Sequence, residues 1–542
     1  QMANCVDACM ARSRRTRPAR FFDRHKDYVR AAGTLDAVYF FSCFGDRLWA
    51  FSIGFFIADL GGLAWVALGQ LLDSLIKLIL LPIIGNYLDS SERHKGMQII
   101  LLCNNIFIAC SAVAFFLSLS KFFDETMTIV LLIVALLLNA LSRVASEAQK
   151  AAFNKDWIIV IVRESKVGKL STHNSVFSAI DQIAAFSAPF LSGECMEIIG
   201  KPQTALVFMG WNIVSWVIES LVIRHLYQNT PALHQRDQRR SKEEEPVTEH
   251  ALAVYFRQKC FRPAFALSLL FMTVLGFDNI AIAFGNENHI SPAVLGGFRS
   301  VGALVGFIGV WGYKLMGWKF DVVFIAFFGL ALQNVALLSC SSSVFLPGNE
   351  FDLRGYASNF TLNSWYEDAY SSIFHAKEKA EGAEKSLGWI WENSPSLFFF
   401  FMGITGARFG LWMADPSITE IMQETVPENE RYRVNLTQNA LQESFSVLKD
   451  ILVVAFPLAY TFGGLIFMST TFVFLGFLLF TSYWLTEGFP VRRRKPLSDD
   501  IDVPRLELKV TEPGVHPELA DLLEKGDIEM QAPIQTSRTD AL

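Results

Sequence analysis

The sequence predicts an all-α polytopic membrane protein with about twelve transmembrane helices arranged in two six-helix halves. Hydrophobic residues make up 52% and charged residues 18% of the 542 positions, whereas ordinary soluble domains contain about 25% charged residues. Apolar stretches recur almost end to end, and about 20 residues at 1.5 Å each cross a hydrocarbon layer of about 30 Å. One polar segment separates the stretches into two sets of six. This pattern is typical of a pseudo-symmetric transporter.

The same features argue against other classes of protein. No P-loop, dinucleotide-binding fingerprint or Ser/His/Asp set occurs in a credible context, so we expect no enzyme. The net charge of −6 gives no indication of a nucleic-acid partner.

The N-terminal part begins with a basic segment, residues 1–35, that lacks a long apolar core before a cleavage site. We therefore expect a cytoplasmic tail and not a signal peptide. The N-terminal half, residues 36–228, contains six expected spans, at roughly 36–60, 63–85, 97–119, 127–150, 171–198 and 203–228.

A polar linker, residues 229–261, carries HQRDQRRSKEEEPVTEH and is expected to be a solvated cytoplasmic connection. The C-terminal half, residues 262–486, contains a long loop at 346–393 that would face the lumen or the cell exterior. Residues 487–542 are acidic, without apolar periodicity, and are expected to be a disordered cytoplasmic tail. The expected spans of this half lie at roughly 262–287, 291–317, 320–345, 394–423, 433–460 and 461–486.

Lysine and arginine in alternate loops predict the orientation. Both termini and the basic segments fall on one side, which we interpret as cytoplasmic; these segments are RSRRTRPAR, SSERHK, RESKVGK, the linker, YKLMGWK, NERYR and VRRRK. The opposite loop at 346–393 contains Asn359-Phe360-Thr361, a glycosylation sequon at Asn359. We expect the plasma membrane as the location, with an internal organelle as the alternative.

Four carboxylates stand out within the expected spans: Asp46, Asp181, Glu219 and Asp278. Such residues are costly in a bilayer unless paired, hydrated or bound to an ion, so each is a candidate functional residue. Oxygen ligands suit hard or borderline divalent cations, which favours a metal over an organic anion. We expect Asp46, Asp181 and Asp278 to contact metal.

Structural roles compete with this interpretation. Asp46 could pair internally with Arg47, although consecutive residues do not share a helix face. Asp181 could serve helix packing. Asp278 follows Gly276 within its stretch, and a glycine beside an acid favours a broken helix that faces a polar cavity. All nine histidines lie in loops, tails or span ends, so a histidine-based proton relay is not expected.

Several stretches resemble ferroportin, the family of iron exporters in the major facilitator superfamily, in their order and spacing. They are GDRLW (45–49), IIGNYLD (83–89), KDWIIVI (155–161), IDQ (180–182), GWNIVS (210–215), YQNTPAL (227–233), FMTVLGFD (271–278), ARFGLW (407–412) and QNALQES (438–444). The resemblance implies a fold like that superfamily's and efflux of ferrous iron by alternating access between the halves.

The resemblance also implies roles for particular residues. Asp181 matches an acid of the conducting path, and Asp278 matches the acid in the broken seventh helix. A calcium site in the N-terminal half, where Ca²⁺ would act as a modulator, would comprise Asp46, Asn104, Asn212 and Glu219, with Asn104 in place of a longer amide. A cytoplasmic gate would comprise Asp89, Arg93, Asp156, Asn174, Asp415 and Arg431, while Ser178 stands where an arginine is common.

Three positions depart from the best-known animal members. Ala50 and Lys449 stand where those members have histidines, and Asn279 stands where they have a cysteine. Loss of nitrogen and sulfur ligands favours harder ions, so Mn, Co, Ni and Zn stay open beside iron. That cysteine is also the residue through which the hormone hepcidin recognises vertebrate ferroportin, and control by such a hormone is not expected here.

Two alternatives to iron export remain at this stage. The chain could export another divalent metal or a small organic solute, which competition by iron would reveal. It could instead be a non-transporting membrane receptor or scaffold, in which case purified protein would neither bind nor move an ion.

Overall fold

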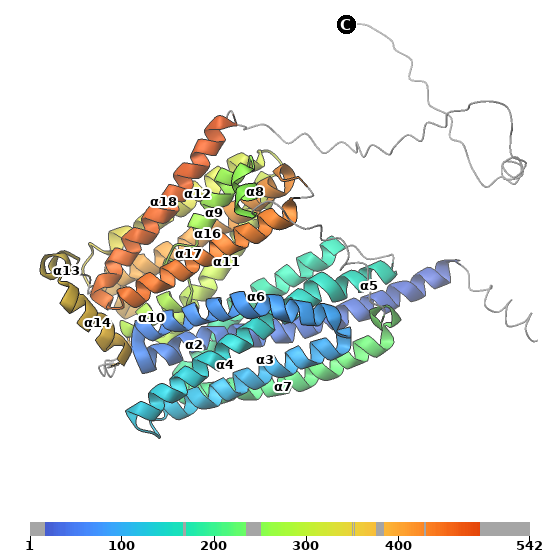
Figure 1. Cartoon of the computed structure of the whole chain (residues 1–542), viewed down its shortest axis with the longest axis horizontal. Coiled ribbons are helices and arrows are strands. Elements are labelled where there is room, and N and C mark those ends of the chain that lie inside the picture. The colour runs from blue at the N-terminus through green and yellow to red at the C-terminus, as the bar shows by residue number, and fades with distance from the viewer. Residues whose placement is uncertain are drawn as a thin grey trace, which may run out of the picture. The chain divides into compact units, whose positions relative to one another are not determined.

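The computed structural model is built of helices (Figure 1). It describes residues 17–165, 170–234, 251–348, 351, 353–374, 384–427 and 430–487. Within these ranges no β-strand occurs, and only an isolated bridge joins Ile290 to Lys385. Most of the expected linker, the C-terminal tail, and the side chains of Asp89, Asn174 and Arg431 lie outside the described residues.

What we call the first group of helices comprises the elements from Arg17 to His234. α2 packs against α4, α6 and α7, and α3 packs between α4 and α7. The elements are α2 (Arg17–Ser90), α3 (Arg93–Leu119), α4 (Glu125–Ala152), the π-helical η1 (Phe153–Trp157), α5 (Ile158–Ser165), α6 (Leu170–Ile199), α7 (Lys201–Asn229) and η2 (Pro231–His234).

The second group comprises the elements from Ala251 to Thr486. α12 packs against α16 and α18, α16 against α11, and α17 against α8 and α9. The elements are α8 (Ala251–Arg257), α9 (Phe261–Leu269), α10 (Asn279–Glu287), α11 (Pro292–Met316), α12 (Val322–Ser343), α13 (Leu353–Asn359), α14 (Leu362–Phe374), α15 (Leu387–Asn393), α16 (Pro395–Thr425), α17 (Arg431–Ala455), η4 (Ala459–Thr461) and α18 (Phe462–Thr486).

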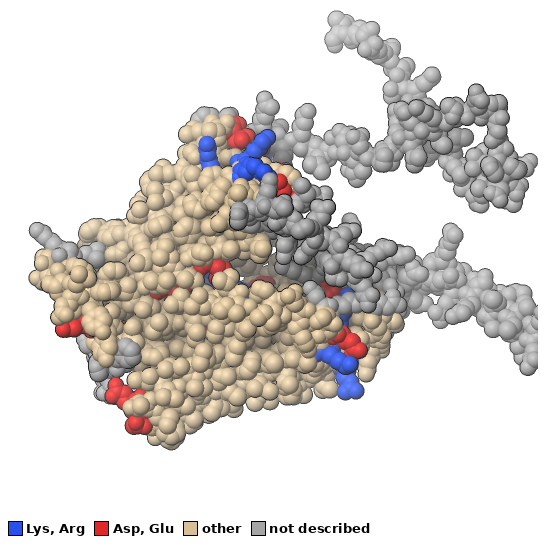
Figure 2. All heavy atoms as spheres, in the orientation of Figure 1, with Lys and Arg blue, Asp and Glu red and all other residues tan. Residues whose placement is uncertain are grey.

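These helices confirm the predicted all-α membrane architecture. In the described part of the chain, eight helices are long and apolar enough to cross a membrane. Large apolar side chains such as Ile79, Leu221 and Val335 are exposed on them, as expected for surfaces that contact lipid. Figure 2 shows a broad face almost free of charged side chains, with charges mainly at its two ends.

The first two expected spans form one hydrogen-bonded helix, α2, with a kink at Gly62. Gly62 has φ 69° and ψ −165°, a conformation essentially restricted to glycine. The kink frees the backbone N–H of Leu63, which donates to Glu287 Oε1 of α10 at 2.6 Å. α2 also begins at Arg17, well inside the segment that we expect as a tail, and its residues Ala32 and Leu35 are buried.

The expected span at 262–287 is interrupted, as the glycine and acid predict. α9 ends at Leu269 and α10 begins at Asn279. Side chains satisfy part of the freed backbone: Val274 N–H donates to Ser469 Oγ of α18 at 2.9 Å, and Leu275 N–H donates to Thr273 Oγ1 at 3.0 Å. Irregular backbone at membrane depth is tolerated where it is buried in protein or lines a cavity.

The two groups contact each other closely where α6 meets α11. A Cβ on Gly193 would lie 2.5 Å from the carbonyl oxygen of Pro292, and a Cβ on Gly296 would lie 2.4 Å from that of Pro189. Only glycine permits these two reciprocal approaches.

Further contacts join the groups at what we call the Gly62 end, defined by Gly62, Asp59, Lys201 and Asn286. Lys201 Nζ lies 2.7 Å from Asp59 Oδ2 and 3.1 Å from Asn286 Oδ1, and Asn286 Nδ2 donates to Asp59 Oδ1 at 2.7 Å. The opposite end, which contains Arg93, carries the basic loop SSERHK.

The long loop at 346–393 also lies at the Gly62 end, and it contains helices α13 to α15. Trp65 of α2 donates to the carbonyl of Ile373 at 2.9 Å, and Trp365 donates to the carbonyl of Ala455 at 2.8 Å. α14 therefore contacts helices of both groups.

Candidate metal site

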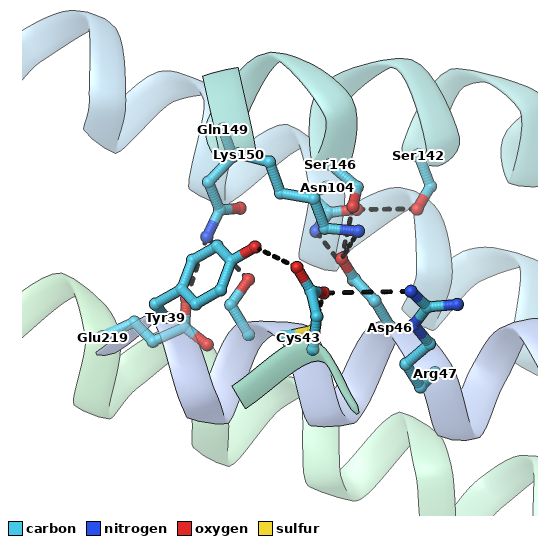
Figure 3. A network of polar contacts seen from close by, with 12 residues as sticks. Tyr39, Cys43, Asp46, Arg47, Asn104, Ser142, Ser146, Gln149, Lys150 and Glu219 are labelled. Atoms are coloured by element: carbon cyan, nitrogen blue, oxygen red, sulfur yellow. Dashed lines mark hydrogen bonds and ion pairs between the residues drawn. The ribbon is translucent and has the colours of Figure 1, made fainter. Parts of the chain in front are cut away.

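Asp46 lies in α2 and faces α3 and α4 (Figure 3). Its carboxylate accepts a hydrogen bond from Ser146 Oγ, and Asn104 Nδ2 lies 3.5 Å from Oδ1. Lys150 of α4 places Nζ 3.6 Å from Oδ2. Because the Asp46 carboxylate is only 11% exposed, this lysine supplies the positive charge that a nearly buried acid requires.

Glu219 of α7 belongs to the same polar cluster. It is buried, and it accepts hydrogen bonds from Ser215 Oγ at 2.5 Å and Gln149 Nε2 at 3.3 Å. Gln149 Nε2 also donates to Ser42 Oγ at 2.7 Å, whereas Gln149 Oε1 is buried without a hydrogen-bond partner. This amide oxygen is an available ligand between α2, α4 and α7.

Three of the four residues of the expected calcium site lie in this polar cluster, and the fourth, Asn212, bonds to its own helix. Asp46 and Asn104 are in contact, and Glu219 reaches the cluster from α7 (Figure 3). Asn212 donates its amide to the carbonyl of Phe208 at 2.7 Å on its own helix.

Asp181 of α6 forms the adjoining network. Tyr39 Oη donates to it at 2.8 Å and Cys43 Sγ at 2.9 Å. Arg47 Nη2 lies 3.8 Å from Asp181 Oδ1. Arg47 therefore pairs with Asp181, and the alternative that it pairs with Asp46 is not observed.

Asp278 is the N-cap residue of α10, after the break. Its Oδ1 accepts hydrogen bonds from the backbone N–H groups of Ile280 and Ala281, each at 3.2 Å, as N-cap aspartates commonly do. Its Oδ2 lies 2.9 Å from Lys449 Nζ of α17, and the same nitrogen lies 3.1 Å from Asp450 Oδ1. One ammonium group is thus held by two carboxylates.

Gln70 of α2 connects this pair of acids to the first group of helices. In the amide orientation that satisfies both partners, its nitrogen lies 3.1 Å from Asp450 Oδ1 and its oxygen 3.1 Å from the backbone nitrogen of Asn279. The side chain of Asn279, at the position that departs from the resembled family, approaches Gly54 of α2.

Two arginines add positive charge to the surroundings of Asp278. Arg299 and Arg408 both interact electrostatically with it and with Arg47. The guanidinium of Arg299 lies 5.4 Å from the ring centroid of Phe51, a cation–π distance. This positive field opposes the binding of a dication to Asp278 alone.

The described gate residues lie in different helix groups. Arg93 forms a bidentate pair with Asp156, at 2.9 Å for both bonds, and Nη1 lies 3.3 Å from the carbonyl of Leu233. All three residues belong to the first group of helices. Asp415 lies in α16 of the second group.

Sequence reasoning did not single out Asp450, Asp73 or Asp36. Asp450 and Asp73 lie within expected spans, and charge inside an apolar stretch was the signal that could have revealed both. Asp73 accepts from Asn139 Nδ2 at 3.1 Å. Asp36 pairs with His173 at 3.6 Å, and that histidine is buried in the first turn of α6 although the sequence places it at a span end.

The donors in these clusters are mainly carboxylate and amide oxygens. Among the described residues no group of three or more His, Cys, Asp and Glu side chains is arranged to hold a metal ion. A metal at either cluster would therefore combine one or two carboxylates with amide or backbone oxygens and water, a donor set that suits harder divalent cations.

Comparisons with known proteins cover most of the chain. The family described as Ferroportin1 (FPN1) matches residues 30–473. Solute carrier family 40 member 1 of Danio rerio is 26% identical over 522 residues, which cover 84% of this chain and 92% of the relative. Human ferroportin is 27% identical over 508 residues (81% and 88%), and the Oryza sativa member is 24% identical over 472 residues (82% and 89%).

Solved structures show the same fold. A bacterial homologue of the iron transporter ferroportin in its inward-facing state matches with a TM-score of 0.63 and 19% identity, covering 84% of this chain and 98% of that one. An outward-facing form of such a homologue with soaked iron matches with a TM-score of 0.53 and 19% identity, covering 83% and 98%.

Proposed function

Since this chain belongs to the ferroportin family, we propose that it exports ferrous iron across the membrane by alternating access between its two helix groups. Membership makes it a multi-pass membrane transporter and not an enzyme. Iron as substrate is supported by the likeness to bacterial homologues of the iron transporter ferroportin, one of them soaked with iron. The direction of transport rests on the family.

The observation that carries the proposal is the position of Asp278 at the break between α9 and α10. An acid beside unwound backbone, in a helix that would otherwise cross the membrane, is a common arrangement of ion sites in secondary transporters. We propose that Asp278 binds the metal in one half and that Asp46 binds it in the other, with Asp181 on the path between them.

Alternating access requires contacts that break at each end in turn. We propose that the Gly62 end faces the cell exterior, where Lys201, Asp59 and Asn286 hold the halves together in the present conformation. The basic loops support a cytoplasmic position for the opposite end, where Arg93 and Asp156 would belong to the second gate. Asp89, Asn174, Asp415 and Arg431 complete the proposed gate.

Further features follow from the proposed orientation and the family. Asn359 is exposed at the end of α13, which suits glycosylation on the exterior of the plasma membrane. Calcium would act as a modulator at Asp46, Asn104 and Glu219, with Asn212 at the edge. Hepcidin-type control is not proposed, because Asn279 carries no thiol.

The test is radiolabelled Fe²⁺ release from cells that express the full chain, D46A or D278A. We expect release by the wild type and its loss in both variants, while surface labelling shows unchanged expression. Asp124→Ala is a matched control, because this acid directly precedes α4, and the α4 residues of the Asp46 cluster, such as Ser146, lie about 30 Å further along that helix. Iron release that persists in D278A would contradict the assigned site.

A second candidate is export of a harder divalent metal such as Mn²⁺. The carboxylate oxygens that Asp278 and Asp450 offer favour it. Competition of unlabelled Mn²⁺, Co²⁺, Ni²⁺ and Zn²⁺ against Fe²⁺ in the same assay ranks the substrates. No iron movement together with Mn²⁺ movement would replace iron by manganese in the proposal.

A further inference from the structure

The ammonium group of Lys449 lies at a point where two carboxylates from different elements converge. Asp278 belongs to the cap of α10 and Asp450 to α17, and their nearest oxygens lie 2.9 and 3.1 Å from the same nitrogen. A lysine ammonium is a cation with hydrogen-bond donors and no acceptor. The Lys449 ammonium thus occupies the space between Asp278, at the break before α10, and Asp450.

Asp450 has more binding capacity than this ion pair uses. Its side chain is 1% exposed, and Oδ2 is buried without a hydrogen-bond partner. An unpartnered oxygen on a buried carboxylate carries a desolvation cost that a second ligand would relieve. This oxygen is on the acid whose other oxygen already contacts the lysine.

The carboxylate of Asp450 also offsets the positive charge near Asp278. Asp278 commits Oδ1 to the backbone of α10 and lies in the field of Arg299 and Arg408. One remaining carboxylate oxygen is too little for a dication in such surroundings. Asp450 adds a second negative charge, and Gln70 of α2 donates its amide nitrogen to Asp450 Oδ1 and holds that carboxylate in place.

We propose that Asp278 and Asp450 together form the metal site of the C-terminal half, and that Lys449 is a tethered cation which occupies this site until metal displaces it. The inference rests on the proposed function and extends it to two residues. When a divalent ion enters, the flexible lysine side chain moves its charge away from the two acids. When the ion leaves, Lys449 returns and neutralises one of them.

Competition between Lys449 and the metal makes opposite predictions for neighbouring residues. Lys449→Met removes the competitor, so the affinity for metal should rise at least tenfold. Asp450→Asn removes a ligand and keeps the Lys449–Asp278 pair, so the affinity should fall at least tenfold. If Lys449 served only packing, its removal would weaken or preserve binding and would not strengthen it.

The experiment titrates Mn²⁺ into the purified full-length protein and follows binding by calorimetry. Wild type, K449M, D450N and D278A are compared with Glu443→Gln, an acid two turns earlier on α17 that pairs with Lys77 and should bind within twofold of wild type. Unchanged binding in D450N, or weaker binding in K449M, overturns the proposal. If K449M does not fold, the comparison of wild type with D450N decides.

Flux in proteoliposomes separates this inference from the proposed function. Wild-type protein that binds Mn²⁺ through Asp450 but moves no divalent ion would disprove transport and leave the site standing. Wild-type protein that moves Fe²⁺ or Mn²⁺, with D278A inactive and D450N fully active, would leave the transporter standing and disprove the two-acid site.

Discussion

Glu287 of α10 accepts a hydrogen bond at 2.6 Å from the backbone N–H of Leu63, directly after the kink in α2. A backbone donor freed by a kink in one helix group is thus satisfied by a side chain of the other group. The contact couples the local conformation of α2 to the distance between the groups at the Gly62 end.

Removing the acceptor should therefore loosen this end. In Glu287→Ala the N–H of Leu63 loses its partner, and we expect hydrogen–deuterium exchange in the segment 60–66 to accelerate at least tenfold. Glu287→Gln keeps an acceptor oxygen and should change exchange much less. Equal protection of this segment in wild type and E287A would show that the hydrogen bond does not control opening here.

The kink itself should require glycine. A Cβ at position 62 would lie 3.1 Å from Glu287 Oε1, at φ +69°, and a strained backbone of this kind costs about 1–3 kcal/mol. We expect Gly62→Ala to lower the thermal unfolding temperature of the purified protein. Gly210→Ala is the control, because no neighbouring atom lies within 4 Å of a Cβ there, and helix propensity predicts unchanged or higher stability.

Lys150 should compete with calcium at Asp46. Its ammonium lies 3.6 Å from the carboxylate, and a unit charge at about 4 Å contributes on the order of 4 kcal/mol at an effective dielectric constant of 20, before screening. We expect Lys150→Met to bind Ca²⁺ at least tenfold more tightly than wild type in calorimetric titrations. The double variant K150M/D46N should lose this gain; if it does not, calcium binds elsewhere.

The bidentate pair of Arg93 and Asp156 should stabilise the first helix group. Arg93 is 8% and Asp156 32% exposed, so its loss should cost about 1–3 kcal/mol, toward the lower end because of the partial exposure. Arg93→Met should lower the unfolding temperature. Arg93→Lys should lower it less, because lysine keeps the charge but lacks the fork geometry that binds a carboxylate at two points. Lys95→Met, in an exposed pair with Glu92, should have little effect; a drop as large as that of R93M would contradict the argument.

The sequence predicts most of the fold because each span must carry its own apolar residues. The expected boundary between residues 60 and 63 falls on the kink at Gly62, and Gly276 beside Asp278 predicts the break in the seventh stretch. The helices of the loop at 346–393 were not expected, since short polar helices lack apolar periodicity and depend on contacts such as that of Trp65 with Ile373.

The sites were predicted less completely. An acid inside an apolar stretch is visible in the sequence, and this signal predicts Asp46, Asp181 and Asp278 as site residues. The sequence does not reveal the partners of these acids, because pairing depends on how distant helices pack. Arg47 contacts Asp181, and Lys150 contacts Asp46. Asp450 was overlooked beside Lys449, although its contact with that lysine places it at the centre of the second cluster.

The break between α9 and α10 has a consequence for how the chain enters the membrane. Each of the two helices contains nine residues, so each is about 14 Å long and spans about half of a hydrocarbon layer of about 30 Å. Neither can insert as an independent transmembrane segment, and the exposed polar backbone between them is unfavourable in lipid. The segment therefore depends on other helices to cover it: α2 of the first group contacts α10, and α18 contacts α9. Biogenesis of the second half consequently depends on the first, and substitutions at this contact should reduce the yield of assembled protein before they affect transport.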